Sequence, residues 1–201
     1  MSTITITNLT TKDTKKIIEI FSDGFEDYPL MEYFFGDAYK QSIKHLIQFT
    51  CDRASEGNGL LLGAFVEGNL QGVASIAPPQ NDQKVEKTAT SLEEKFATAI
   101  GEEALMRIEK YSELKKANKP ASPHFYINTL AVIPQNQGKG IGSAILSHIH
   151  QMSEQDSDSH GVALDTQTQQ NVDYYQRFGY EVSATAKLEN VNNWFMFRRN
   201  N

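Results

Sequence analysis

The chain has 201 residues, a length that one hydrophobic core organises readily, so we expect a single domain over residues 1–201. Hydrophobic residues make up 39% and aromatic residues 10%, which excludes a disordered chain. The 25 acidic residues outnumber the 19 basic ones and leave a net charge of −6. This balance disfavours nucleic acid and anionic membranes as partners.

Cys51 is the single cysteine of the sequence, which excludes an intramolecular disulfide and a cysteine-based zinc site. The N-terminus has no basic region followed by an apolar segment, and no run approaches the roughly 18 to 20 apolar residues of a membrane span. We therefore expect a soluble, cytoplasmic protein that holds no metal.

The first 76 residues predict alternating strands and helices. Apolar and polar residues alternate at the start, and helix-capping residues at 10–13 precede an apolar helix face. The turn Glu67-Gly68-Asn69 separates two short apolar runs, which is typical of a β-hairpin. The expected elements are a strand at 4–9, a helix from Asp13 to about Phe21, an aromatic and acidic segment at 25–35 broken by Pro29 and Gly36, a helix ending at 56–59, and strands at 60–66 and 70–76.

A polar stretch at about 78–123 predicts a helical insertion, with a helix opening at Ser91 and a division at Gly101. Beyond it, strands and helices alternate again, which indicates an α/β (α+β) fold. The expected elements are a strand at 125–132, a glycine-rich turn at 134–142, a helix at 143–152, a strand at 162–164, a helix at 171–178 closed by Gly179, and strands at 180–186 and 194–198.

The glycine-rich turn reads Gln137-Gly138-Lys139-Gly140-Ile141-Gly142 and joins a strand to a helix. Glycines let successive backbone N–H groups point into one concavity, and the positive end of the helix dipole adds to them, so such a turn suits a pyrophosphate. Its spacing fits neither the Walker A loop nor the dinucleotide-binding fingerprint. An ordinary strand-to-helix connection remains the alternative.

A second segment favours the phosphate-binding interpretation. With the turn and the strand before it, the block from Asn171 to Tyr180 makes residues 125–182 resemble the GNAT N-acetyltransferase superfamily. Gln137-x-x-Gly140-x-Gly142 is similar to the Q/R-x-x-G-x-G/A signature of that superfamily, and Asn171 with Tyr175 is similar to its Asn-x-x-x-Tyr helix. A second match begins at Gln135, but we prefer the first because we expect the helix to begin immediately after Gly142.

The resemblance implies a GNAT fold: a mixed central sheet of about seven strands with a splayed central pair, flanking helices, and an extra helical insertion before the fourth strand. It implies acetyl-CoA as co-substrate, bound between the strands at 125–132 and 162–166. The acetyl group would pass to a primary amine of a small molecule or peptide by direct attack. The cofactor-binding residues implied are Leu130, Ala131, Val132, Gln137, Gly138, Lys139, Gly140, Ile141, Gly142, Ser143, Asn171 and Tyr175.

The resemblance assigns the general acid to Tyr175, whose phenol would protonate the departing thiolate. No general base is identified, because the strand at 125–132 contains no carboxylate. Asp165 is a candidate substitute, with turn capping as the more conservative interpretation. A water chain is another option, and His124 is interpreted as structural.

Four questions stay open: the nature of the acceptor site, the role of the insertion, the place of the run at 194–197, and the function itself. Residues 17–39 contain six acidic and seven aromatic residues and no Lys or Arg, which suggests either a cationic amine site or a core with a solvated face. The insertion is either a lid or an extra helix, and the run at 194–197 is either a core strand or an edge that pairs in a homodimer. The rival functions are a GNAT-fold acetyl-CoA sensor without turnover and a generic nucleotide-binding protein.

Overall fold

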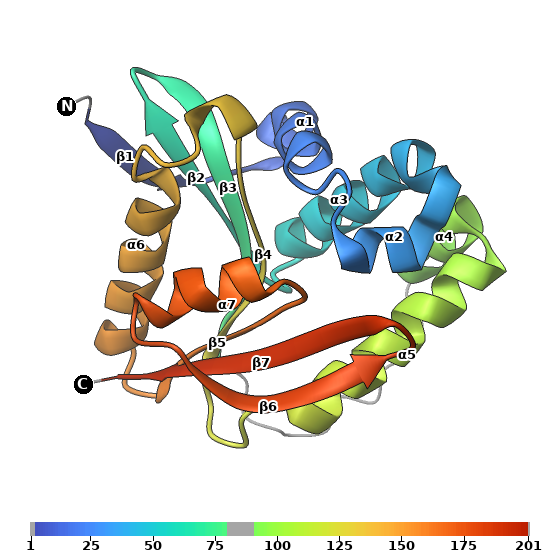
Figure 1. Ribbon diagram of the computed structural model, residues 1–201. Helices are drawn as coiled ribbons and strands as arrows, with labels where there is room; N and C mark the ends of the chain where they lie inside the picture. Colours follow the sequence, from blue (N-terminus) through green and yellow to red (C-terminus); the bar gives the residue numbers. More distant parts are fainter. Residues whose placement is uncertain (1–2, 80–90, 201) are drawn as a thin grey trace.

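The computed structural model describes residues 3–79 and 91–200. A seven-stranded sheet, in the order β1-β2-β3-β4-β5-β7-β6, forms its centre, with helices on both faces (Figure 1). Neighbouring strands are antiparallel except β4 and β5, which run parallel. The predicted mixed sheet of about seven strands flanked by helices is confirmed.

The strands occupy the predicted regions with small differences at their ends. The 60–66 and 125–132 strands have the predicted bounds, whereas the last strand begins three residues earlier than predicted because it pairs with β6 up to their connecting turn. The strands are β1 (Ile4–Asn8), β2 (Leu60–Val66), β3 (Asn69–Ala77), β4 (Phe125–Val132), β5 (Gly161–Thr166), β6 (Glu181–Leu188) and β7 (Val191–Arg199).

The helices depart further from the sequence-based bounds. The helix after the glycine-rich turn begins at Ile141, so the expectation that it begins after Gly142 is wrong: Gly140 is the N-cap and Gly142 lies in the first turn. The helices are α1 (Thr14–Gly24), α2 (Pro29–Phe35), α3 (Tyr39–Ser55), α4 (Ser91–Ile100), α5 (Glu102–Asn118), α6 (Ile141–Gln155) and α7 (Gln169–Gln176), with short 3-10 turns at Thr11–Asp13, Gly36–Ala38 and Pro134–Asn136.

Two hydrophobic clusters cover the two faces of the sheet. Ile145, Leu146 and Ile149 of α6 pack with the strands in one cluster. Phe21 of α1 and Ile47 of α3 belong to the other cluster, which also takes in α2 and α5. Figure 1 shows α6 on one side of the sheet and α1 to α5 on the other. Burial of apolar area on both faces therefore fixes the sheet between two helical layers.

Helix α2 was not expected from the sequence. Pro29, interpreted there as a break, occupies the first turn of α2, where its missing N–H costs no helical hydrogen bond. Gly36 ends the helix with φ +48°. Seven residues are too few for a clear amphipathic period. Helix α2 is instead stabilised by the burial of Leu30, Phe34 and Phe35 in the core.

The predicted helical insertion before β4 is confirmed. Gly101, with φ +84°, separates α4 from α5, as expected for a residue that adopts the left-handed region freely. Phe96 of α4 stacks on Phe49 of α3 with ring centroids 4.4 Å apart, so α4 lies against the α3 layer. The part of the insertion at residues 80–90 lies outside the described residues.

The central pair of strands separates as predicted. Strand β4 pairs with β5 only from Phe125 to Ile127, although β4 continues to Val132. In its ladder with β3, Asn128 is an extra residue between Ile127 and Thr129, which is a β-bulge. Because the pairing with β5 ends where the bulge begins, the later residues of β4 diverge from β5 and leave an opening.

Within the described part of the chain, no helix has the length and apolar character that crossing a membrane requires.

Candidate active site

A groove with a volume of about 440 Å³ occupies the opening between β4 and α7. All of the predicted cofactor-binding residues except Lys139 line it. Gly24 and Phe25 at the end of α1 and Tyr28 before α2 contribute another wall, which the sequence interpretation missed. The residues that line the groove are Gly24, Phe25, Tyr28, Leu130, Ala131, Val132, Asn136, Gln137, Gly138, Gly140, Ile141, Gly142, Ser143, Thr168, Gln170, Asn171, Tyr174, Tyr175 and Arg177.

The glycine-rich turn presents backbone N–H groups to the groove. Gly138 and Gly140 have φ +76° and +84°, a region in which side chains are strained, so glycine is the suitable residue at both positions. The N–H of Ala144 is the first to bond within α6, to the carbonyl of Gly140. The N–H groups of residues 141–143 therefore have no partner earlier in the helix, and together with the helix dipole they can bind an anion.

Two side chains of the turn act on its shape. Gln137 Nε2 donates to the carbonyl oxygen of Val132 at 3.3 Å, which ties the turn back to β4. Lys139 Nζ donates to Asn136 Oδ1 at 2.6 Å, and Lys139 lies outside the residues that line the groove. The groove therefore offers backbone dipoles at this end, while its nearest lysine is directed to a neighbour in the turn.

Helix α7 forms the opposite wall. Thr168 caps the helix by accepting the N–H of Asn171 at 3.3 Å, so the helix starts at Gln169 and not at Asn171 as predicted. The interval of four residues places Asn171 and Tyr175 on one face of α7, and both line the groove. The sequence signal for this start was Thr168 itself, a preferred N-cap residue.

Tyr175 lies at the junction between the groove and an inner chamber. The chamber has a volume of about 60 Å³, and Tyr175, Leu130 and Asn171 line both spaces. Burial, and then the neighbouring Tyr28, Tyr174 and Asp165, raises the pKa of the Tyr175 phenol. The phenol is therefore protonated at neutral pH, which is the state that a proton donor requires.

Asp165, the candidate base, points into the chamber and is held there by three hydrogen bonds. Its Oδ1 accepts from Tyr126 Oη at 2.6 Å, and its Oδ2 accepts from Tyr111 Oη at 2.7 Å and from Gln167 Nε2 at 2.8 Å. It is half-buried at the end of β5. The conservative interpretation, a solvated aspartate that caps a turn, does not describe this environment.

Tyr111 connects the insertion to the chamber. It belongs to α5, lines the chamber and packs edge-on against Phe34 of α2, with ring centroids 5.4 Å apart. The insertion therefore supplies a wall of the site, in addition to the contact that α4 makes with α3. Its role as a lid stays a hypothesis.

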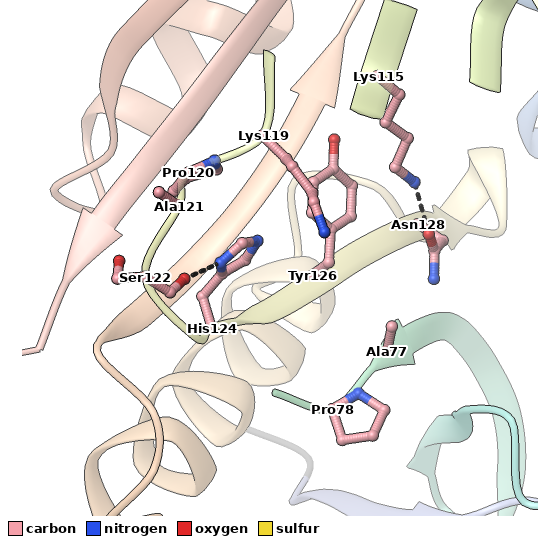
Figure 2. A pocket seen from close by; sticks show the side chains of 10 residues that line it. All are labelled: Ala77, Pro78, Lys115, Lys119, Pro120, Ala121, Ser122, His124, Tyr126 and Asn128. Carbon is pink, nitrogen blue, oxygen red and sulfur yellow. Dashed lines mark hydrogen bonds between the residues drawn. The ribbon is translucent and has the colours of Figure 1, made fainter. Parts of the chain in front are cut away.

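A second hollow, the rear hollow, lies behind β4 and is lined by Lys115, His124, Tyr126 and their neighbours (Figure 2). Figure 2 shows Lys115 reaching from α5 to Asn128 Oδ1, 2.7 Å away, beside the ring of Tyr126. The His124 Nδ1 atom is 2.6 Å from the carbonyl oxygen of Ser122, and the ring packs against Tyr126 and Phe197. His124 lines neither the groove nor the chamber, which agrees with its structural interpretation.

The acidic and aromatic segment at 17–39 divides between core and site. All six carboxylates, from Glu19 to Asp37, are exposed, whereas Phe21, Phe34 and Phe35 are core residues. Phe25 and Tyr28 line the groove and the chamber. A third space, the outer cleft, lies between α2 and the β6–β7 turn, is lined by Glu32, Tyr33, Glu189 and Gln167 among others, and shares Gln167 with the chamber.

The run at 194–197 belongs to β7, which lies between β5 and β6. It is therefore an interior strand, so that run is not the edge of the sheet. Among the residues described, no cluster of three or more His, Cys, Asp or Glu side chains has the arrangement of a metal site.

Known proteins with the same fold were found by comparison. Residues 93–182 match the family model described as an acetyltransferase (GNAT) domain. A Corynebacterium glutamicum structure described as histone acetyltransferase HPA2 and related acetyltransferase is 19% identical, with a TM-score of 0.75 and coverage of 100% of this chain and 98% of that one. Arylalkylamine N-acetyltransferase 2 from Aedes aegypti is 15% identical, with a TM-score of 0.73 and coverage of 98% and 99%.

A third structure contains a ligand. The PaiA N-acetyltransferase of Thermoplasma acidophilum, solved in complex with coenzyme A, is 14% identical, with a TM-score of 0.61 and coverage of 98% and 99%. The fold of these structures and the family match agree with each other. Residues 93–182 therefore match a GNAT acetyltransferase domain, and the chain as a whole has the fold of these acetyltransferase structures.

Proposed function

We propose that this enzyme transfers the acetyl group of acetyl-CoA to a primary amine of a small molecule or peptide, by direct attack in a ternary complex. The observation that carries the proposal is the position of Tyr175, which lines both the groove and the inner chamber. A cofactor in the groove with its thioester at this junction would face an acceptor in the chamber. The described strands form one sheet, and the described helices pack on it or on one another, which supports a single domain.

The residues of the groove suit acetyl-CoA. The unpaired N–H groups at the start of α6 fit a pyrophosphate, and the unpaired edge of β4 beyond Ile127 fits the amides of a pantetheine arm. The similarity to a coenzyme A complex supports this choice. In this proposal Leu130 and Val132 bind the arm through backbone groups, Asn171 holds it from α7, and Tyr175 protonates the thiolate.

The acceptor class follows from the size of the chamber and from the similarity to an arylalkylamine N-acetyltransferase. The structure also speaks against the rival acetyl-CoA sensor, since the carboxylate that β4 lacks is supplied to the chamber by Asp165 of β5.

The test has two steps, binding and turnover. Acetyl-CoA should raise the melting temperature, whereas ATP and NAD should not. Free CoA thiol should then appear when alkylamines, arylalkylamines or peptides with free N-termini are added. Stabilisation by acetyl-CoA with no thiol release from any amine would favour the sensor, and stabilisation by ATP or NAD alone would favour the nucleotide-binding protein.

A further inference from the structure

The chamber contains one strong electrostatic feature. Asp165 is the charged side chain among the described residues that line it, and the others are aromatic, aliphatic or neutral polar groups. A carboxylate surrounded by such groups attracts a cation strongly, because the local dielectric constant is lower than that of water.

The hydrogen bonds to Asp165 fix its geometry and leave room for one more donor. Each carboxylate oxygen has two lone pairs. Oδ2 uses both, for Tyr111 and Gln167, whereas Oδ1 accepts only from Tyr126 among the described residues. Burial, and then the charge of Asp165, raises the pKa of Tyr111 and of Tyr126 well above the ordinary value, so both phenols remain neutral donors. The remaining lone pair of Oδ1 is suited to an N–H donor from a ligand.

Lys115, a cation beside Tyr126, does not fill this position. Lys115 Nζ lies 3.9 Å from the centroid of the Tyr126 ring and donates to Asn128, on the side of the rear hollow (Figure 2). Tyr126 lines the rear hollow and reaches Asp165 only through its hydroxyl. Lys115 therefore lines the rear hollow and not the chamber. Its ammonium attracts Asp165 electrostatically, but the hydrogen bond that it donates goes to Asn128, which lines both spaces.

A second polar atom of the chamber also lacks a partner. The hydroxyl oxygen of Thr129, at the bulge of β4, is buried without a hydrogen bond among the described residues, and Thr129 lines the chamber. A buried hydroxyl without a partner is unfavourable, so a polar ligand group at this position would relieve that cost.

We propose that Asp165 binds the ammonium group of the acceptor and takes its first proton, with Tyr111 of the insertion and Tyr126 as the residues that position it. The inference rests on the proposed acetyl transfer and adds the substrate class: primary alkylamines that are cations in solution. The chamber, at about 60 Å³, admits an aminomethyl end but no aromatic ring, so the remainder of the amine lies toward the outer cleft.

The proposed step accounts for every proton. The acceptor enters as R–NH3+ and gives one proton to Oδ1 of Asp165, which lines the chamber. The free lone pair forms the bond to the thioester carbonyl carbon. When the C–S bond breaks, Tyr175 protonates the thiolate, and the second proton lost by the nitrogen restores the phenol. The products are the N-acetyl amine and the CoA thiol, and the proton on Asp165 is released to water.

The test compares acceptors of one shape and different charge. Phenethylamine is a cation at pH 7.5, about three units below its pKa, whereas O-benzylhydroxylamine has the same shape and is neutral. Butylamine and O-propylhydroxylamine form a second pair. We expect Asp165→Asn to lower kcat/KM for the alkylamine about 100-fold and for its neutral isostere less than about 5-fold. Binding of acetyl-CoA, measured by thermal shift, should be unchanged.

Matched variants separate this role from a structural one. Asp173→Asn removes an equal charge from α7, where Asp173 accepts a hydrogen bond from Gln169, and should change kcat/KM for neither acceptor. Tyr111→Phe keeps the Asp165 carboxylate but removes one of its hydrogen bonds. We therefore expect kcat/KM to fall about 10-fold for the alkylamine and to stay unchanged for the neutral isostere. This variant also serves if Asp165→Asn does not fold.

Three outcomes would overturn the inference. An equal loss for both members of a pair would show a structural role, and unchanged preference for the alkylamine would show that Asp165 does not bind it. A wild-type enzyme that acetylates the neutral isostere at least as well as the alkylamine would overturn the inference alone. If neither pair, nor any other amine, released CoA thiol from the wild type, the proposed acetyl transfer would fail as well.

Discussion

The hydroxyl group of Tyr28 lies 3.0 Å from the hydroxyl group of Thr166, although 138 positions separate them in the chain. The same phenol accepts the backbone N–H of Gln167 at 3.1 Å. Tyr28 precedes α2, and Thr166 ends β5. The contact therefore fixes the start of α2 against the end of β5 and closes one side of the chamber.

Replacing Tyr28 by Phe should lower the free energy of unfolding by about 1–3 kcal/mol, because the buried N–H of Gln167 loses its acceptor. Urea denaturation measures the change. Tyr33→Phe is the matched control: its hydroxyl makes only a long, exposed bond of 3.4 Å to Glu189, so its effect should stay below about 0.5 kcal/mol. Equal effects of the two substitutions would contradict the proposed support of β5.

Replacing Tyr175 by Phe should lower kcat about 100-fold and leave acetyl-CoA binding unchanged, because in the proposed mechanism the phenol protonates the departing thiolate. Since burial raises the pKa of this phenol, it should remain protonated below pH 10 and should cause no loss of activity on the alkaline side up to that pH. Steady-state kinetics over pH 6–10 tests both statements. Tyr39→Phe removes a phenol that bonds Ser22 outside the site and should have no effect on kcat. Unchanged turnover in Tyr175→Phe would exclude its role as acid.

Replacing Gly140 by Ala should destabilise the protein by about 1–2 kcal/mol, because an alanine is strained at φ +84° although no atom lies within 4 Å of its Cβ position. Gly140→Asn should cost less, since asparagine tolerates the left-handed region. Chemical denaturation measures the stability. A titration with acetyl-CoA measures whether displacement of the N–H groups at the start of α6 weakens binding. If alanine and asparagine cost the same, steric strain is not the cause.

His150 should make the protein less stable in mild acid. Burial, and then the charge of Arg198, lowers the pKa of His150 to about 4, and its Nε2 atom lies 3.0 Å from Tyr180 Oη. The unfolded chain binds a proton at this histidine below about pH 6.5, whereas the folded protein does so only near pH 4. The contribution of His150 is therefore complete above pH 6.5 and is lost as the pH falls toward 4.

Between pH 7 and pH 5 the expected loss at this site is about 2 kcal/mol. Unfolding by urea at several pH values measures it. His150→Gln should be less stable at pH 7 but should show a shallower dependence on pH over this range. An identical slope in both proteins would mean that other groups carry the dependence.

The elements with strong local signals were determined by the sequence. Strands β2 and β4 have continuous or alternating apolar residues between clear breaks, and the glycines at 138 and 140 mark positions with positive φ. The four-residue interval between Asn171 and Tyr175 also acts locally, because it places both on one helix face. Local backbone preferences suffice for these features.

Features that depend on contacts between distant parts of the chain were decided only by the tertiary structure. In the sequence Asp165 is an ordinary aspartate at the end of a strand. In the structure its carboxylate is fixed by hydrogen bonds from Tyr111 and Tyr126, which lie 54 and 39 residues earlier in the chain. Helix α2 likewise depends on burial in the core, since seven residues with a proline carry little helical signal. Such contacts arise when the sheet and its insertion pack together, and no local pattern encodes their distances. The sequence by itself therefore determined the fold and most residues of the groove, and packing alone decided the environment of Asp165 in the chamber.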